Sequence, residues 1–368
     1  MSLLARLSIG CHHWSYSDCP VPGFAGSDSS PSYSASEGSL FVGSYDGRVY
    51  KVSNNGTSWN VEWAVAGPGG EDSPKLCEEL GQFVAWGGLE GDSLGGYGTG
   101  DGRELWSWAA PAPVTTSGAS GGYVVAGTSD GGGGSLHALA AGTGEELWGR
   151  EMGGELWGTL GPLFVEGMVC VGVGGSANMF ADEGSAVACL ALRSGEEVWR
   201  AESGRQIQSR PSAGEGSLFV GDYDGCVRSF ALADGEPGWK TCFKDDARWA
   251  SVEGSTAVHT AEDGKETVLV DSFSGYLYSL DGETGAVVWK QKLGSTYLTG
   301  GGAASSPRIA GGRVYVGGPD GIWAFDVVTG EKLWKHEVGT QCGSSPEAFG
   351  DGLVAIACED GYLYILRG

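Results

Sequence analysis

The stretch Ala324-Phe-Asp-Val-Val-Thr-Gly-Glu-Lys-Leu-Trp334 recurs along the sequence and decides the fold. Its closest copies are Ser279-Leu-Asp-Gly-Glu-Thr-Gly-Ala-Val-Val-Trp289 and Ala138-Leu-Ala-Ala-Gly-Thr-Gly-Glu-Glu-Leu-Trp148. Each copy ends in a tryptophan that a Thr-Gly pair precedes by a fixed distance. A motif that returns at regular intervals indicates a fold built from structural repeats.

Weaker copies complete a series of eight tryptophans. The series is Trp14, Trp63, Trp106, Trp148, Trp199, Trp239, Trp289 and Trp334. A glycine lies four residues before each of the last six, whereas the copy at Trp63 lacks that glycine. Counted round through the C-terminus, the spacings run from 40 to 51 residues and average 46. That period is typical of one four-stranded blade of a β-propeller.

Each unit also carries strand and turn signals. An apolar run bounded by glycine, such as Ser39-Leu-Phe-Val-Gly43, precedes an Asp-Gly pair and a second apolar run. Asp-Gly between two such runs predicts a hairpin with a type I′ turn, in which both central residues have positive φ. A Ser-Ser-Pro triplet, as at residues 305–307, precedes the first strand of several units. Proline suits that place because a strand's first residue needs no ladder N–H.

The last unit supplies three strands before the chain ends at Gly368, so residues 4–14 are expected to supply its fourth strand. The prediction is therefore an all-β fold and one domain over residues 1–368. It is an eight-bladed β-propeller of four-stranded antiparallel blades whose ring is closed by the N-terminal strand.

The motif at 324–334 resembles the tryptophan-docking repeat of quinoprotein-type (PQQ-like) eight-bladed propellers, and the resemblance covers essentially the whole chain. In quinone-dependent alcohol dehydrogenases of this family, adjacent half-cystines and a calcium ion form the cofactor pocket. This chain has no Cys-Cys pair and lacks the long inserts of those enzymes, so we expect no enzyme and no cofactor. In length it is more similar to the propeller of the outer-membrane β-barrel assembly lipoprotein. It also resembles the propeller of acyl-activating enzymes of the aminoadipate-semialdehyde dehydrogenase type.

Sequence patterns for other chemistry are weak. Cys11, His12, His13 and Cys19 cluster, but neither Cys-x-x-Cys nor His-x3-5-His spacing is present, so no metal site is predicted. The segment 222–225 resembles part of a calcium loop but is interpreted as a hairpin turn, because other units carry Asp-Gly there. The eight repeat tryptophans are interpreted as structural, each filling the space between blades while its N–H bonds to a neighbouring backbone.

One face of the ring gathers the candidate binding residues. In an up-and-down blade, the connection that enters the innermost strand and the turn between the second and third strands emerge on the same face. Arginines and aromatic residues, which are typical of binding hot spots, lie there just before several innermost strands. The candidates for a partner or ligand are Trp157, Arg205, Gln206, Arg210, Arg248, Trp249, Tyr297 and Gln341.

Composition bounds the partners and the compartment. The formal net charge is −24, from 22 Lys plus Arg and 46 Asp plus Glu, which argues against nucleic-acid partners. No stretch approaches the roughly 18 continuous apolar residues that a membrane helix needs, so direct membrane insertion is not expected. The nine cysteines are odd in number and several lie in apolar runs, so most are expected to be buried thiols. We therefore expect a soluble intracellular protein, or a periplasmic or secreted one if a signal has been removed.

The functional prediction is a non-catalytic protein-interaction scaffold, part of a larger assembly, that binds through this face. The alternative is a propeller that binds a small ligand at the central mouth, in a degenerate quinone-type site.

Overall fold

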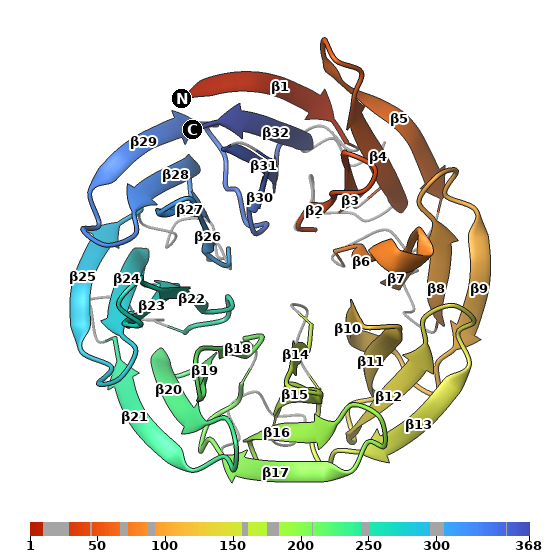
Figure 1. Cartoon of the computed structure of the whole chain (residues 1–368), viewed down its shortest axis with the longest axis vertical. Coiled ribbons are helices and arrows are strands. Elements are labelled where there is room, and N and C mark those ends of the chain that lie inside the picture. Colours follow the sequence, from red (N-terminus) through yellow and green to blue (C-terminus); the bar gives the residue numbers. More distant parts are fainter. Residues whose placement is uncertain are drawn as a thin grey trace.

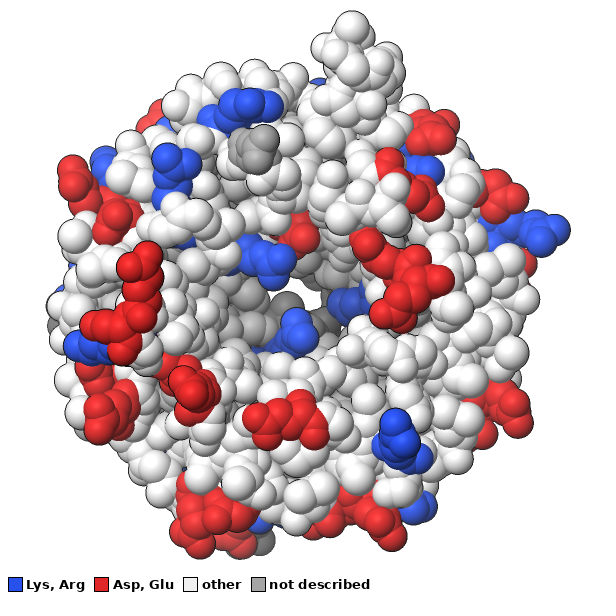
Figure 2. Space-filling model, viewed as in Figure 1, with Lys and Arg blue, Asp and Glu red and all other residues white. Residues whose placement is uncertain are grey.

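The computed structural model describes residues 1–9, 29–44, 46–66, 73–86, 93–156, 161–174, 184–207, 209–243, 251–294, 305–350 and 352–368. Eight four-stranded antiparallel sheets form a ring (Figure 1), which confirms the predicted eight-bladed propeller. The space-filling view shows that a central channel remains open (Figure 2). We number the blades in chain order, from blade 1 (β2 to β5) to blade 8 (β30, β31, β32 and β1). The short 3-10 helix η1 (Glu78–Leu80) interrupts blade 2. Within the described ranges, no helix is both long and apolar enough to cross a membrane.

The strands of each blade run outward from the channel, and we call them A, B, C and D. The innermost A strands of blades 1 to 8 are β2 (Ser32–Ser34), β6 (Lys75–Cys77), β10 (Val114–Ser120), β14 (Leu163–Val165), β18 (Ser212–Ala213), β22 (Ala257–Thr260), β26 (Arg308–Ala310) and β30 (Glu347–Phe349). The B strands are β3 (Ser39–Ser44), β7 (Gln82–Trp86), β11 (Tyr123–Ser129), β15 (Met168–Val173), β19 (Ser217–Gly221), β23 (Glu266–Ser272), β27 (Arg313–Gly318) and β31 (Leu353–Cys358). The C strands are β4 (Arg48–Asn54), β8 (Ser93–Gly98), β12 (Gly134–Ala140), β16 (Ala186–Ala191), β20 (Cys226–Ala231), β24 (Tyr276–Asp281), β28 (Gly321–Asp326) and β32 (Tyr362–Arg367). The outermost D strands are β5 (Trp59–Ala66), β9 (Glu104–Ala109), β13 (Glu146–Glu151), β17 (Glu197–Glu202), β21 (Pro237–Cys242), β25 (Val287–Lys292), β29 (Lys332–Glu337) and, in blade 8, β1 (Ser2–Ser8).

The N-terminal strand closes the ring, as predicted, but with different bounds. β1 covers Ser2–Ser8 rather than residues 4–14, and it pairs antiparallel with β32, Ser2 opposite Arg367 and Ser8 opposite Tyr362. The two chain ends therefore lie side by side on the outer rim (Figure 1). Trp14 lies outside the described residues. In the register of β1 with β32, Ala5 occupies the place that the repeat tryptophan has in other blades.

The B–C turns are not of the type that the Asp-Gly pairs predicted. In blade 5, Gly225 donates its N–H to the carbonyl of Asp222 at 3.1 Å and has a φ of 76°. Asp224 does not share the positive φ of a type I′ turn, because Glu166 is the one non-glycine residue with positive φ in the described ranges. The glycine therefore lies just after the two central residues, where it takes the left-handed conformation that closes a three-residue hairpin loop.

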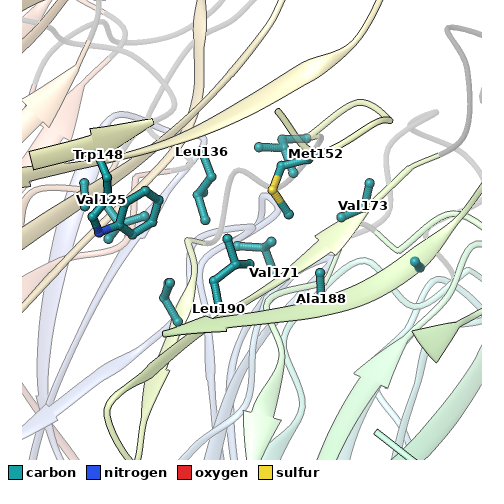
Figure 3. Close-up of a cluster of buried hydrophobic side chains, with 12 residues drawn as sticks. Val125, Leu136, Trp148, Met152, Val171, Val173, Ala188 and Leu190 are labelled. Carbon is teal, nitrogen blue, oxygen red and sulfur yellow. The ribbon is translucent and has the colours of Figure 1, made fainter. Parts of the chain in front are cut away.

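The hydrophobic core lies between neighbouring blades rather than at the centre of the ring. β3 is buried along its whole length, because the inner strands of a blade are covered on both faces by the adjacent blades. Figure 3 shows one cluster, in which Val125 and Leu136 of blade 3 lie opposite Val171 and Leu190 of blade 4. Similar clusters recur round the ring, so each blade is stabilised mainly by its two neighbours.

The D-strand tryptophans join each blade to the next one. Trp199 of blade 4 donates its indole N–H to the carbonyl of Leu232 in blade 5 at 2.9 Å, and its ring lies against Gly235. A Cβ on Gly235 would come within 2.5 Å of that ring. The same two contacts recur for Trp63, Trp106, Trp148, Trp239 and Trp289. Glycine is required in the motif because it receives the tryptophan of the preceding blade, a reason that the sequence alone did not reveal.

Serines of the Ser-Ser-Pro triplets connect the inner strands. The first serine is buried and accepts a backbone N–H from the B strand of its own blade, as Ser305 does from Gly317 at 2.9 Å. The second serine links neighbouring blades: Ser306 donates its N–H to the hydroxyl of Ser345 at 3.0 Å, and Ser345 donates to that of Ser30 at 2.9 Å. Equivalent bonds run from Ser255 to Ser306 and from Ser30 to Ser73. A relay of hydrogen bonds from backbone N–H groups to serine hydroxyls thus passes from blade 6 through blades 7, 8 and 1 to blade 2.

The cysteine prediction is wrong, because six of the seven cysteines in the described ranges form disulfides. Cys170 pairs with Cys189, Cys226 with Cys242, and Cys342 with Cys358. The partners of the first two pairs are 16 to 19 residues apart in sequence but lie directly opposite one another on antiparallel B–C or C–D strands. Cys77 is a free thiol, and burial together with the nearby Glu79 raises its pKa to about 11. Cys11 and Cys19 lie outside the described residues.

Candidate binding face

The D–A connections and B–C turns form what we call the loop face. Of the predicted residues, Trp157, Arg248, Trp249 and Tyr297 fall on this face by sequence but lie outside the described residues. The structure describes the other four, Arg205, Gln206, Arg210 and Gln341. It brings them into three different environments rather than one pocket.

Gln206 and Gln341 occupy equivalent positions in two D–A connections. The carbonyl of Gln206 accepts the N–H of Tyr223 at 3.1 Å, and that of Gln341 accepts the N–H of Glu359 at 3.0 Å. Each bond ties a D–A connection to the B–C turn of the blade that the chain is entering. Both glutamine side chains are buried, so they offer little surface to a partner.

The same backbone lock recurs at two positions that the sequence did not single out. The carbonyl of Glu155 accepts the N–H of Gly174 at 2.7 Å, and that of Ser251 accepts the N–H of Phe273 at 3.0 Å. In all four locks the next residue is apolar or cysteine and almost fully buried, and these residues are Leu156, Ile207, Val252 and Cys342. The signal in the sequence is a polar residue followed by a small or branched apolar one, before the A strands β14, β18, β22 and β30.

Arg205 remains on the surface of the loop face. Its Nε lies 2.6 Å from Oδ2 of Asp224 in the adjacent B–C turn, and both side chains are partly exposed. The turn itself is organised by the buried Asp222, whose carboxylate accepts the N–H of Cys226 at 2.9 Å and Nε of Arg228 at 3.0 Å. Burial raises the pKa of Asp222, while these two donors oppose the shift. Because its oxygens serve the turn, the geometry agrees with a hairpin here rather than with a calcium loop.

Arg210 lies in the central channel and not beside Arg205. It replaces the second serine of the triplet in blade 5, and its Nε donates to the carbonyl of Pro162 in blade 4 at 3.1 Å. Burial of the guanidinium within the ring lowers the pKa of Arg210, and repulsion by Arg308 lowers it further. The residue as a whole is nevertheless solvent-exposed.

Carboxyl groups with raised pKa are distributed over several blades. Burial is the largest cause for each of Glu253, Asp271 and Glu347, as it is for Asp222. Within the described part of the chain, the interactions that oppose these shifts come from hydroxyl and backbone donors and from Arg or Lys side chains. These groups do not form the closely coupled pair that acid–base chemistry uses.

One cluster in blade 3 has the order of groups found in nucleophilic catalysis. Nε2 of His137 lies 3.4 Å from Oγ1 of Thr128, and its Nδ1 lies 3.1 Å from Oε1 of Glu146. Thr128 is only 1% exposed and His137 7%, so no substrate reaches the hydroxyl. The cluster therefore cross-links three strands of one blade. Across the described ranges, no group of three or more His, Cys, Asp or Glu side chains is placed to hold a metal ion.

Solved structures share this architecture across the whole chain. BamB from Moraxella catarrhalis superposes with a TM-score of 0.70 at 14% identity, covering 100% of this chain and 99% of that one. A europium-containing methanol dehydrogenase gives a TM-score of 0.71 at 13% identity, covering 96% of this chain and 84% of that one. At these identities the likeness shows the fold alone.

Curated relatives are more similar in sequence but over shorter lengths. Outer membrane protein assembly factor BamB of Shewanella oneidensis is 27% identical over 164 residues, which is 42% of this chain and 40% of that protein. Its counterpart in Burkholderia pseudomallei is 27% identical over 204 residues, which is 53% of this chain and 48% of that protein. The polyvinylalcohol dehydrogenase of a Sphingopyxis strain is 37% identical over 84 residues, 20% of this chain and 13% of that protein. The chain thus spans about half the length of the relatives it matches, or less.

A family profile covers far more of the sequence. It matches residues 90–185, 182–265 and 223–368, which together reach from the third strand of blade 2 to the last residue. Most of the tryptophan-to-glycine contacts lie inside the matched residues, and blade 1 continues the same architecture outside them. The chain belongs to the PQQ-like propeller family described as outer membrane protein assembly factor BamB.

Proposed function

We propose that this chain is a non-catalytic scaffold that binds protein partners through the loop face. The observation that carries the proposal is the repeated backbone lock at Glu155, Gln206, Ser251 and Gln341, which holds these four D–A connections against the blade that the chain enters. The lock is the same in each place, whereas the residues above it differ from blade to blade. A rigid ring that presents several differently decorated loops suits recognition of a protein surface.

Two features argue against an enzyme. Within the described residues, each carboxyl group with raised pKa is shifted mainly by burial and not by a second carboxyl group, and the histidine cluster of blade 3 is closed to substrate. The quinone enzymes of the family carry adjacent half-cystines, whereas each disulfide of the described residues joins cysteines 16 or more positions apart. The residues present therefore do not fit that cofactor pocket.

We further propose that the protein works outside the cytoplasm, in place of the intracellular location expected from sequence. Three disulfides occur in the described ranges, and disulfides persist mainly in oxidising compartments. The relatives' names describe assembly factors of outer membrane proteins, so the proposed setting is a cell envelope and the partners are proteins of such an assembly. Alkylation and mass measurement without reductant test the disulfides in the protein from its native source.

The binding face is tested with matched double variants. Arg205→Ala and Arg248→Ala together remove two cations that the sequence assigns to the loop face. Arg103→Ala and Arg193→Ala remove the same charge from turns at the opposite end of the blades. We expect the first double variant to lose its partners in affinity purification and the second to keep them. Full retention by the first variant would contradict the proposal.

A site-specific cross-linker gives an independent measurement. A photoreactive residue in place of Asp224, beside Arg205, should cross-link to the partner. The same residue in place of Asp263, in the A–B turn of blade 6 on the opposite side, should not. Equal cross-linking from both positions would overturn the choice of face.

A further inference from the structure

Cationic side chains gather in the central channel of this strongly acidic protein. The three that the structure places at the A-strand level are Lys75 in β6, Arg210 just before β18 and Arg308 in β26. Figure 2 shows lysine or arginine side chains grouped round the opening, while most of the visible acidic groups lie farther out. They come from blades 2, 5 and 7, so only the closed ring brings them together.

Two of these cations converge on the same short segment of blade 4. Nε of Arg210 donates to the carbonyl of Pro162 at 3.1 Å. A Cβ added to the neighbouring Gly161 would lie 3.9 Å from Cε of Lys75. That glycine also has a φ of 92° and would bring its Cβ within 2.6 Å of the carbonyl of Ser117. A lysine of blade 2 and an arginine of blade 5 thus approach the same two-residue segment of blade 4.

Arg308 adds a second guanidinium from another side of the channel. It is close enough to Arg210 to lower the pKa of that arginine, after the larger effect of burial. Glu347 offsets part of the positive charge, since its Oε2 lies 3.4 Å from Nη2 of Arg308. Within the described residues, the two guanidiniums of Arg210 and Arg308 thus lie near one carboxylate, that of Glu347. Like charges held together in a confined space repel, and an anion between them relieves that repulsion.

Arg210 also has donors to offer. Of its three guanidinium nitrogens, Nε alone makes a hydrogen bond within the described ranges, and the residue as a whole is solvent-exposed. A planar guanidinium presents its remaining N–H groups in a fork that matches the oxygens of a phosphate or carboxylate. Blades 1, 7 and 8 carry serine at the position of Arg210, so the repeat itself does not require the arginine.

We propose that the central channel binds a small oxyanion, a molecule carrying phosphate or carboxylate groups, between Arg210 and Arg308. Lys75 contributes a further positive charge at the Gly161–Pro162 segment. The site lies inside the ring and is separate from the proposed protein-binding surface of Arg205 and the loop-face turns.

Thermal unfolding with inorganic phosphate and with citrate tests this site, with NaCl at equal ionic strength as the reference. At saturating concentration, phosphate or citrate should raise the midpoint of the native chain by about 2 °C or more beyond NaCl. The two ligands distinguish a phosphate from a carboxylate preference. No stabilisation by either one beyond NaCl would overturn the proposal.

The variants Arg210→Ser and Arg103→Ser make a matched pair. Arg210→Ser restores the serine of the repeat and should fold normally, whereas Arg103 is an exposed arginine of a C–D turn far from the channel. Calorimetric titration should show binding weakened about tenfold or more in Arg210→Ser, the loss expected for one charge-assisted contact, and unchanged in Arg103→Ser. The double variant Arg210→Ser with Arg308→Ser should show no binding. Equal affinities in Arg210→Ser and Arg103→Ser would refute the site.

Discussion

The interface between blades 8 and 1 differs from the other interfaces of the ring. At the six interfaces from blades 1 and 2 to blades 6 and 7, a D-strand tryptophan packs on the motif glycine of the following blade, as Trp199 packs on Gly235. In blade 8 the D strand has Ala5 at that place. The glycine position of blade 1, four residues before Trp63, is occupied instead by Trp59. At this interface the tryptophan therefore comes from the following blade and the small residue from the preceding one, the reverse of the usual arrangement.

Trp59 fills the space from the opposite side. It is buried, and its ring meets the edge of Phe349 from blade 8 with the centroids 5.7 Å apart. Ala5 and Leu7 of the closing strand pack against the same cluster. The comparison teaches that the volume between blades must be filled, whereas either blade can supply the ring that fills it.

Removal of residues 1–9 should have the largest effect. The deletion strips β1 from β32 and takes away the fully buried Ile9, so we expect a loss of about 5 kcal/mol or more, comparable with the whole stability of many domains. Circular dichroism and size-exclusion chromatography should show unfolded or aggregated protein. A circular permutant that joins residue 368 to residue 1 and opens the chain near Gly264 should keep the fold. A truncated chain that stays monomeric with an unchanged midpoint contradicts the role of β1.

The exchange of residues is tested by Trp59→Ala. Loss of a buried tryptophan costs about 3–5 kcal/mol, and we expect urea unfolding to show a loss in this range. Adding Ala5→Trp should recover part of that loss in the Trp59→Ala protein but destabilise the native sequence, where the space is already filled. If Ala5→Trp has the same effect in both backgrounds, the two residues do not share one space.

The indole N–H bonds can be compared between two tryptophans. Trp199 donates to Leu232, whereas Nε1 of Trp334 is buried without a hydrogen-bond partner in the described part of the chain. Trp199→Phe should therefore cost about 1 kcal/mol more than Trp334→Phe, because it leaves a buried carbonyl unpaired. Urea unfolding of the two variants measures the difference. Equal losses would show that ring volume alone decides stability here.

The smallest effect is expected at the surface of the closing strand. Nη2 of Arg6 lies 3.0 Å from Oδ2 of Asp360, and its guanidinium lies 3.7 Å from the ring centroid of Tyr362. Arg6→Ala should lower stability by about 0.5–1 kcal/mol, since exposed pairs contribute little. Thermal unfolding at low and high salt should show a smaller loss at high salt. A loss of the same size at both salt concentrations would assign the effect to packing on Tyr362 rather than to the ion pair.

The repeat explains why the fold could be predicted from the sequence. Tryptophans at near-constant spacing, apolar runs and glycine turns state the blade period directly, and the missing strand of the last unit indicates closure by the N-terminus. Trp59 was not recognised because it occupies the glycine position of a degenerate copy. Its role depends on Ala5, which lies at the other end of the ring closure and has no motif of its own.

The candidate site was less accessible to sequence reasoning. Arg205 and Arg210 are five positions apart, yet one lies on the loop face and the other in the channel, because the chain turns between them into the innermost strand. Arg210 of blade 5 and Arg308 of blade 7 come near each other only because the ring is closed. The disulfides were missed for the same reason, since pairing depends on strand register rather than on cysteine spacing.

The serine relay of the inner strands provides a second set of contacts between blade 8 and blade 1, where the two ends of the chain close the ring. Ser345 of blade 8 donates its N–H to Ser30 of blade 1, across a separation of 315 residues. β1 pairs with β32 at the outer edge of blade 8. The bond from Ser345 to Ser30, with its neighbours in the relay, links blades 8 and 1 beside the central channel. The ring therefore resists opening between blades 8 and 1, because breaking either the outer strand pairing or the inner serine bonds leaves the other contact in place.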